Sequence, residues 1–72
     1  MSIKLNEVAS STIKAVGYDY EHKDLHVHFV NGGEYLYENV PAEVYAKLLE
    51  ADSKGRFLHA EVIGKYNYAK LK

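Results

Sequence analysis

The chain has no cysteine, only one proline among its 72 residues, and no long apolar segment. Without cysteine it can form no disulfide, thiolate metal site or thiol nucleophile, and a reducing compartment suits such a chain. No apolar run reaches the ~18 residues of a membrane-spanning helix, and residues 1–11 lack the apolar core of a signal peptide. We therefore expect one soluble, cytoplasmic domain over residues 1–72.

Acidic residues are scarce in the last part of the chain, although the net charge of the whole is -1. Residues 1–52 contain four basic and nine acidic residues, whereas residues 53–72 contain five basic residues and Glu61 alone. This asymmetry is consistent either with an anionic partner or with a charge distribution that only keeps a small domain soluble.

Three segments in the first half have the pattern of β-strands. Residues 12–20 are rich in β-branched and aromatic residues and end in a polar turn. Residues 25–30 alternate in polarity, and the Asn-Gly-Gly sequence at 31–33 predicts a tight hairpin, because these residues tolerate positive φ. The return strand is expected at 34–38.

The return strand contains one of three Tyr-x-Tyr pairs in the chain. Side chains alternate across a strand, so Tyr35 and Tyr37 share one face while Glu34 and Glu38 share the other. The glutamates indicate that their own face is exposed to solvent. We therefore expect both tyrosines on the core side, together with the apolar residues of the 25–30 strand.

The second half predicts two helices. Pro41 suits the first turn of a helix, where its missing N–H is harmless, and this helix is expected to close at Asp52. Its apolar stripe consists of Val44, Tyr45, Leu48 and Leu49. Ser53 is a candidate N-cap for a second helix that runs to about residue 64.

The order of strands followed by helices predicts an α+β domain. We expect an antiparallel meander of about three strands with both helices packed on one face. Residues 1–10 are either an arm, a short strand or a turn of helix. Residues 66–71 are either a short extended segment that packs back on the sheet or a fraying end.

The arrangement of several short motifs resembles the KTSC domain family over about residues 8–70. The motifs are SS-x-I, GYD, L-x-V-x-F, NGG-x-Y-x-Y, VP, A-x-S-K-G-x-F and a terminal Y-x-Y. They stand at Ser10, Ser11, Ile13, Gly17, Tyr18, Asp19, Leu25, Val27, Phe29, Asn31, Gly32, Gly33, Tyr35, Tyr37, Val40, Pro41, Ala51, Ser53, Lys54, Gly55, Phe57, Tyr66 and Tyr68.

The resemblance implies a single KTSC-like domain of a kind found at the C-terminus of some lysyl-tRNA synthetases and as small free-standing bacterial proteins. The family has no established function, and its association with the synthetase implies RNA binding. The sequence departs from the family pattern at His59, where asparagine is common, and at Ile63, where a basic residue is common.

The candidate binding site is the basic C-terminal segment, where lysines alternate with tyrosines. Aromatic rings that stack on bases, together with basic groups that contact phosphates, hold single strands without reading their sequence. We therefore predict RNA, tRNA or ribosomal, as the ligand; the alternatives are a protein-interaction module or a homodimer formed through a sheet edge. The candidate residues are Lys54, Arg56, Lys65, Tyr66, Tyr68, Lys70 and Lys72.

The remaining polar residues indicate neither a metal site nor an active site. His26 and His28 share a strand face, with His22 in the preceding turn, but no further ligand follows at a usual metal-site spacing. Ser10 and Ser11 belong to no recognisable nucleophile motif. We expect a non-enzymatic module without metal or cofactor.

Overall fold

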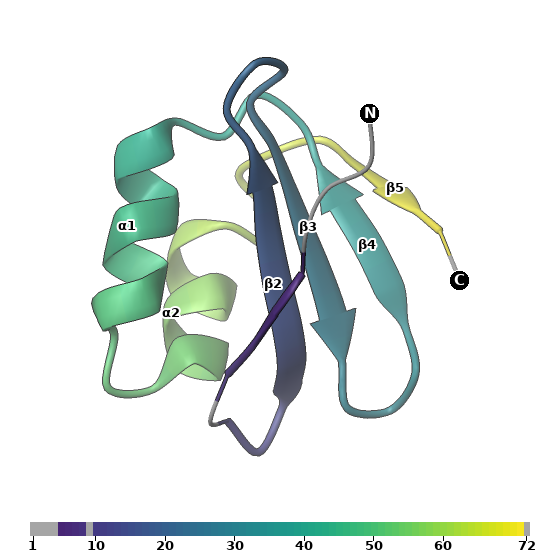
Figure 1. Cartoon of the computed structure of the whole chain (residues 1–72), viewed down its shortest axis with the longest axis vertical. Coiled ribbons are helices and arrows are strands. Elements are labelled where there is room, and N and C mark those ends of the chain that lie inside the picture. Colours follow the sequence, from purple (N-terminus) through teal and green to yellow (C-terminus); the bar gives the residue numbers. More distant parts are fainter. Residues whose placement is uncertain (1–4, 9, 72) are drawn as a thin grey trace.

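The computed structural model describes residues 5–8 and 10–71. Figure 1 shows two helices on one side of an antiparallel sheet, so the expected α+β class is confirmed. No described helix is long and apolar enough to cross a membrane. The elements are β1 (Asn6–Glu7), β2 (Ile13–Asp19), β3 (Asp24–Phe29), β4 (Glu34–Tyr37), α1 (Ala42–Glu50), α2 (Lys54–Glu61) and β5 (Tyr68–Lys70).

The sheet has five strands in the order β1-β2-β3-β4-β5, so the expected count of three was too low. The three predicted strands are β2, β3 and β4, and the two additional strands lie at the edges. β1 falls within residues 1–10, and β5 lies in the C-terminal tail beside β4. Strands of two and three residues are too short for a visible alternation, so their pairing depends on tertiary contacts.

The hairpin between β3 and β4 turns where it was predicted. Gly32 has a φ of 98°, which glycine adopts without strain. The N–H of Gly32 donates to the carbonyl of Phe29, and the N–H of Phe29 donates to the carbonyl of Gly33. The side chain of Asn31 accepts the N–H of Gly33 at 3.0 Å, which closes the turn locally.

A register shift in β2 brings its first residue into the core. Ile13 pairs with Phe29 and Ala15 pairs with His28, so Lys14 is an extra residue on the β2 side. Because of this bulge, Ile13 shares a face with Val16, although the two are three positions apart. Both side chains are fully buried against the helices.

The helix α1 is anchored to the sheet at its start. Pro41 is its N-cap, and the hydroxyl of Tyr18 donates to the carbonyl of Val40 just before it. The ring of Tyr18 stacks on that of Tyr45, with centroids 5.1 Å apart. Leu48 is fully buried, but Leu49 is 41% exposed, so the predicted apolar stripe is one residue narrower than expected.

The helix α2 begins at its predicted cap and ends earlier than expected. The Ser53 hydroxyl accepts the N–H of Arg56 at 3.3 Å. The helix ends at Glu61, and a turn that includes Gly64, with a φ of 86°, leads to β5. Leu58 and Val62 are fully buried, so they complete the core between α2 and the sheet.

The tyrosine face of β4 lies toward the helices, as predicted. Tyr37 pairs with Leu25 and is 3% exposed, while Tyr35 pairs with Val27 and is half-buried. On the other face Glu34 pairs with His28. That face is half-buried at these two residues rather than fully exposed.

Candidate functional site

A groove of about 780 Å³ opens on the helix side of the sheet, between α2 and the β4–β5 edge. We call it the aromatic groove, because four aromatic rings form its floor and wall. Its size falls within the range of ~300–1,000 Å³ that is usual for ligand sites. It is lined by Thr12, Phe29, Asn31, Gly32, Gly33, Tyr35, Tyr37, His59, Ile63, Tyr68 and Lys70.

The groove exists because β5 adds two side chains to the tyrosine face of β4. Tyr68 pairs with Tyr37 and Lys70 pairs with Tyr35, and paired residues point to the same face of a sheet. The helix α2 covers the centre of the sheet and borders this end only with His59. The rings at the β4–β5 end therefore lie beside the helix rather than beneath it.

The four rings form one continuous cluster. The ring centroid of Tyr68 lies 5.5 Å from that of Tyr35 and 5.9 Å from that of Tyr37. The Phe29 ring meets the Tyr35 ring edge-on, with the two centroids 5.5 Å apart. Tyr68 is 58% exposed, whereas the other three are at least half-buried. Tyr68 is thus a flat apolar surface that is held in place by its neighbours and open to solvent.

Burial raises the pKa of Tyr37 above its ordinary value of 10.0, and the nearby Tyr35 and Tyr68 raise it further. The phenol of Tyr37 is therefore protonated at neutral pH. In this form it can donate a hydrogen bond at the base of the aromatic groove.

The charges in the groove favour an anionic ligand. Lys70 is the one lysine or arginine among the described lining residues, and none of them is aspartate or glutamate. The chain as a whole contains ten acidic residues, so their absence from this surface separates it from the rest of the molecule. A ligand that joins a flat aromatic ring to an anionic group fits this groove, because the walls are aromatic and the single cation lies beside them.

Two of the seven residues predicted for the binding site meet in the groove, and these are Tyr68 and Lys70. Tyr66 is half-buried and packs against the core. The ammonium of Lys65 lies 3.8 Å from the Glu61 carboxylate.

The other predicted basic residues lie elsewhere. Lys54 donates from its Nζ to the carbonyl of Ala51 at 3.2 Å. Arg56 borders a separate hollow between the two helices, together with Lys47. Lys72 lies outside the described residues. The structure therefore does not gather the basic segment into one patch.

Sequence reasoning placed Tyr35 and Tyr37 on the core side but did not assign them to a binding site. Strand alternation was the signal for their orientation, and it was correct. What it could not indicate is how far α2 extends across the sheet, since that depends on helix packing. His59 and Ile63, which depart from the family pattern, also line the groove.

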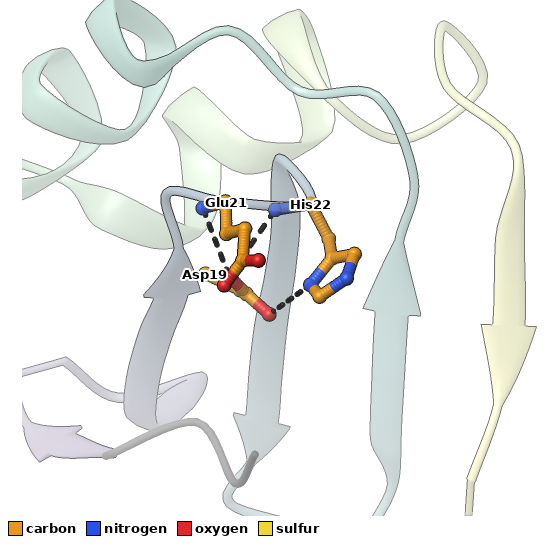
Figure 2. Close-up of polar contacts among 3 residues, drawn as sticks. All are labelled: Asp19, Glu21 and His22. Carbon is orange, nitrogen blue, oxygen red and sulfur yellow. Dashed lines mark hydrogen bonds and ion pairs between the residues drawn. The ribbon is translucent and has the colours of Figure 1, made fainter.

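A second polar cluster, in the turn after β2, is a capped turn (Figure 2). One carboxylate oxygen of Asp19 accepts the N–H groups of Glu21 and His22 at 3.0 and 3.2 Å. The other oxygen lies 2.8 Å from Nδ1 of His22. This hydrogen bond lowers the pKa of Asp19 and raises that of His22.

These three residues are also the one group within the described chain whose ligand atoms are close enough to hold a metal ion. The hydrogen bonds already account for both carboxylate oxygens of Asp19, so the cluster is explained as turn structure. His26 and His28 lie apart from it on β3. The Nε2 atom of His26 is buried, 3.4 Å from a Glu34 carboxylate oxygen.

The sequence model of the KTSC domain family matches residues 9–66. A protein of Tsukamurella paurometabola is 45% identical over 58 residues, which are 81% of this chain and 87% of that protein. An uncharacterised protein of Stutzerimonas stutzeri is 53% identical over 47 residues, or 65% of this chain and 66% of that protein.

The fold matches a crystal structure of a KTSC domain protein from Yersinia pestis. The two share 32% sequence identity with a TM-score of 0.95, and the match covers 99% of this chain and 100% of the other. Agreement over this length includes the short edge strands as well as the central hairpin.

Proposed function

The chain belongs to the KTSC domain family, and from that premise we propose that it is a non-enzymatic module that binds RNA, either tRNA or ribosomal RNA. Membership in the family names no ligand, so the proposal depends on one observation. This observation is the aromatic groove, in which the exposed Tyr68 and the cation Lys70 lie together without a described carboxylate.

The groove suits an unpaired base better than a duplex. A base in a helix is stacked on both sides, whereas a base in a loop or at an end can place one face on an aromatic ring. Tyr68 offers such a ring, and Lys70, two residues away on the same strand, can contact the adjoining phosphate. Lys65 is a further phosphate contact on the way into β5, since its pairing with Glu61 is exposed and weak.

The remaining predicted residues have supporting roles in this proposal. Lys54 and Arg56 lie at the start of α2, away from the groove, and Tyr66 packs against the core. A longer RNA can reach the two basic residues after the first base is bound, so they add affinity that depends on salt. Lys72 is expected to act in the same way.

The composition of the groove supports binding rather than catalysis. Among its described lining residues, His59 is the one imidazole, and no carboxylate, serine or cysteine stands beside it. Thr12 and the tyrosines supply the hydroxyls of the groove, and no carboxylate among the described lining residues completes a nucleophile–base–carboxylate arrangement with His59. A cytoplasmic location, where tRNA and ribosomes occur, is part of the proposal.

The test is an amide NMR titration of the ¹⁵N-labelled protein with a short single-stranded RNA of mixed sequence and with total tRNA. We expect shifts at Tyr35, Tyr37 and residues 65–71, and a logarithmic salt dependence of about -0.7 per phosphate contact. An unchanged spectrum at low salt with both RNAs would refute RNA binding.

Two pairs of substitutions locate the binding surface. Tyr68→Ala should weaken RNA binding roughly fivefold to 150-fold, because stacking of one base contributes about 1–3 kcal/mol. The matched control is Tyr20→Ala, since Tyr20 is 69% exposed but lies outside the groove. Lys70→Gln should also weaken binding and reduce its salt dependence, while Lys47→Gln on α1 should not.

A second candidate function is a protein-interaction module or homodimer that uses a sheet edge. The observation that favours it is the position of β5 at the end of the strand order, with Tyr68 and Leu71 both more than half exposed. Light scattering distinguishes the two functions, since a dimer that ignores RNA would support this one.

A further inference from the structure

The hydrogen bonds between β4 and β5 show which backbone groups of β5 face away from the sheet. The N–H of Leu71 donates to Glu34, and the carbonyl of Asn67 accepts from Glu38. Backbone groups alternate along an antiparallel strand, so Ala69 also faces β4. The N–H and C=O groups of Tyr68 and Lys70 therefore point outward, where no described strand pairs with them.

This edge has some but not all of the features that usually prevent strand pairing. Natural edge strands are protected by short length, charged side chains such as lysine, proline, bulges or a covering element. Within the described residues, β5 contains neither proline nor a bulge, and Figure 1 shows it at the edge of the sheet farthest from both helices. Among the described residues, its length of three residues and the charge of Lys70 act against pairing.

We infer that β5 pairs antiparallel with the β5 strand of a second copy, about a two-fold axis through Ala69. This register is selected by elimination. An axis at Lys70 places two like charges opposite each other, which is unfavourable. An axis at Tyr68 places Lys70 opposite Tyr66, which lies outside the strand. An axis at Ala69 pairs Tyr68 with the partner's Lys70, so every outward N–H and C=O is satisfied.

The side chains are self-complementary in this register. Tyr68 and the partner's Lys70 lie on the same face, so an ammonium group meets the edge or face of an exposed ring twice in the dimer. On the opposite face the small side chain of Ala69 lies at the axis, where two chains approach most closely. The paired sheets form one ten-stranded sheet, with the two aromatic grooves side by side.

The association is expected to be weak, because two strands of three residues bury much less than the ~1,200 Å² of a stable interface. A covalent trap is therefore the appropriate test, and the chain is suited to it because it contains no cysteine. The inference rests on the second candidate function, a homodimer formed through a sheet edge, and specifies its strand and register. The test uses no RNA, so it can fail separately from RNA binding, and failure of this register leaves a dimer through another edge open to detection by light scattering.

The test compares Ala69→Cys with Leu71→Cys in otherwise unchanged protein under mild oxidation. In the proposed register, residue 69 faces itself across a pair without hydrogen bonds, where Cα atoms lie ~4.5 Å apart, within the usual range for a disulfide. Residue 71 lies about 14 Å from its copy, from four steps of ~3.4 Å. We expect a disulfide-linked dimer for Ala69→Cys and a monomer for Leu71→Cys.

A second substitution tests the backbone pairing itself. Lys70→Pro removes an outward N–H and no hydrogen bond within the chain, and edge strands tolerate proline. Added to Ala69→Cys, it should abolish the cross-linked dimer, while Lys70→Ala should retain most of it. Equal cross-linking at residues 69 and 71, or no dimer from folded Ala69→Cys protein, would overturn the inference.

Discussion

The two residues of each Tyr-x-Tyr pair differ in exposure, so the repeated pattern does not repeat one role. Tyr18 is buried and donates a hydrogen bond, while Tyr20 is 69% exposed and packs edge-on against it. Tyr37 is buried while Tyr35 is half-buried, and Tyr68 is 58% exposed while Tyr66 is half-buried. At the scale of single residues, the position of each ring relative to the helices decides whether it stabilises the domain or is open to a ligand.

The Tyr18 hydroxyl gives the first prediction. Tyr18→Phe leaves the buried carbonyl of Val40 without its partner, and such a loss costs about 1–3 kcal/mol. We expect the free energy of unfolding, measured by urea denaturation, to fall by that amount. Tyr20→Phe removes an exposed hydroxyl and should change it by less than about 0.5 kcal/mol. Equal effects of the two substitutions would contradict the role given to this hydrogen bond.

The Asp19–His22 pair gives the second prediction. Its hydrogen bond raises the pKa of His22 above the ordinary value of 6.5. Asp19→Asn should therefore lower the pKa of His22 toward that value, as measured by NMR titration of the imidazole protons. The imidazole signals of His59, which lies in α2 away from this turn, serve as the internal reference. A pKa of His22 that does not change would show that the contact is absent in solution.

The pair also affects stability in a defined pH range. Since the folded pKa of His22 is raised, its contribution is fully present below the unfolded pKa and is lost as pH rises through the folded value. Since the folded pKa of Asp19 is lowered, its contribution is present above about 3.8 and is lost as pH falls through the folded value. The pair therefore stabilises most between about pH 4 and 6.5, and only slightly because the His22 side chain is exposed to solvent.

At the scale of elements, caps and turns give the clearest relation between sequence and structure. Ser53 caps α2 with its hydroxyl, so Ser53→Ala should lower the free energy of unfolding by about 1 kcal/mol. Ser53→Asp retains an oxygen acceptor at the cap and should be close to neutral. Urea denaturation of the three proteins checks both values. If Ser53→Asp lowered the free energy of unfolding as much as Ser53→Ala, the cause would be packing of the serine side chain rather than capping.

The elements that could be predicted from the sequence are those whose own residues specify them. Asn31 and Gly32 specify the hairpin, and Ser53 specifies the start of α2. The edge strands β1 and β5 could not be counted, because they contain too few residues to show a period. The aromatic groove could not be foreseen either, since it needs β5 beside β4 and an end of the sheet that α2 leaves open.

At the scale of the whole molecule, one core connects the sheet to both helices, so the domain should unfold as a unit. Leu48→Ala removes a fully buried side chain and should cost about 2–5 kcal/mol. A domain of this size has a total stability of roughly 4–11 kcal/mol. We therefore expect the midpoints of circular dichroism and of the tyrosine signals to fall together.

The neighbouring residue provides the control for this prediction. Leu49→Ala makes the same chemical change one position along α1, but Leu49 is 41% exposed. Its cost should be below about 1 kcal/mol. Similar losses for the two leucines would mean that α1 presents a broader face to the sheet than the structure shows.

The connectivity of the sheet also orders events in time. The strands β2, β3 and β4 are joined by short turns, but β4 and β5 are separated by both helices. Closing a longer loop costs more entropy, so we expect the hairpins to form early in folding and β5 to pair late. A short strand held at one edge should also be among the first elements to open in the native state. The wall of the aromatic groove would then be transient, and a bound ligand would be detected as slower hydrogen exchange at β5.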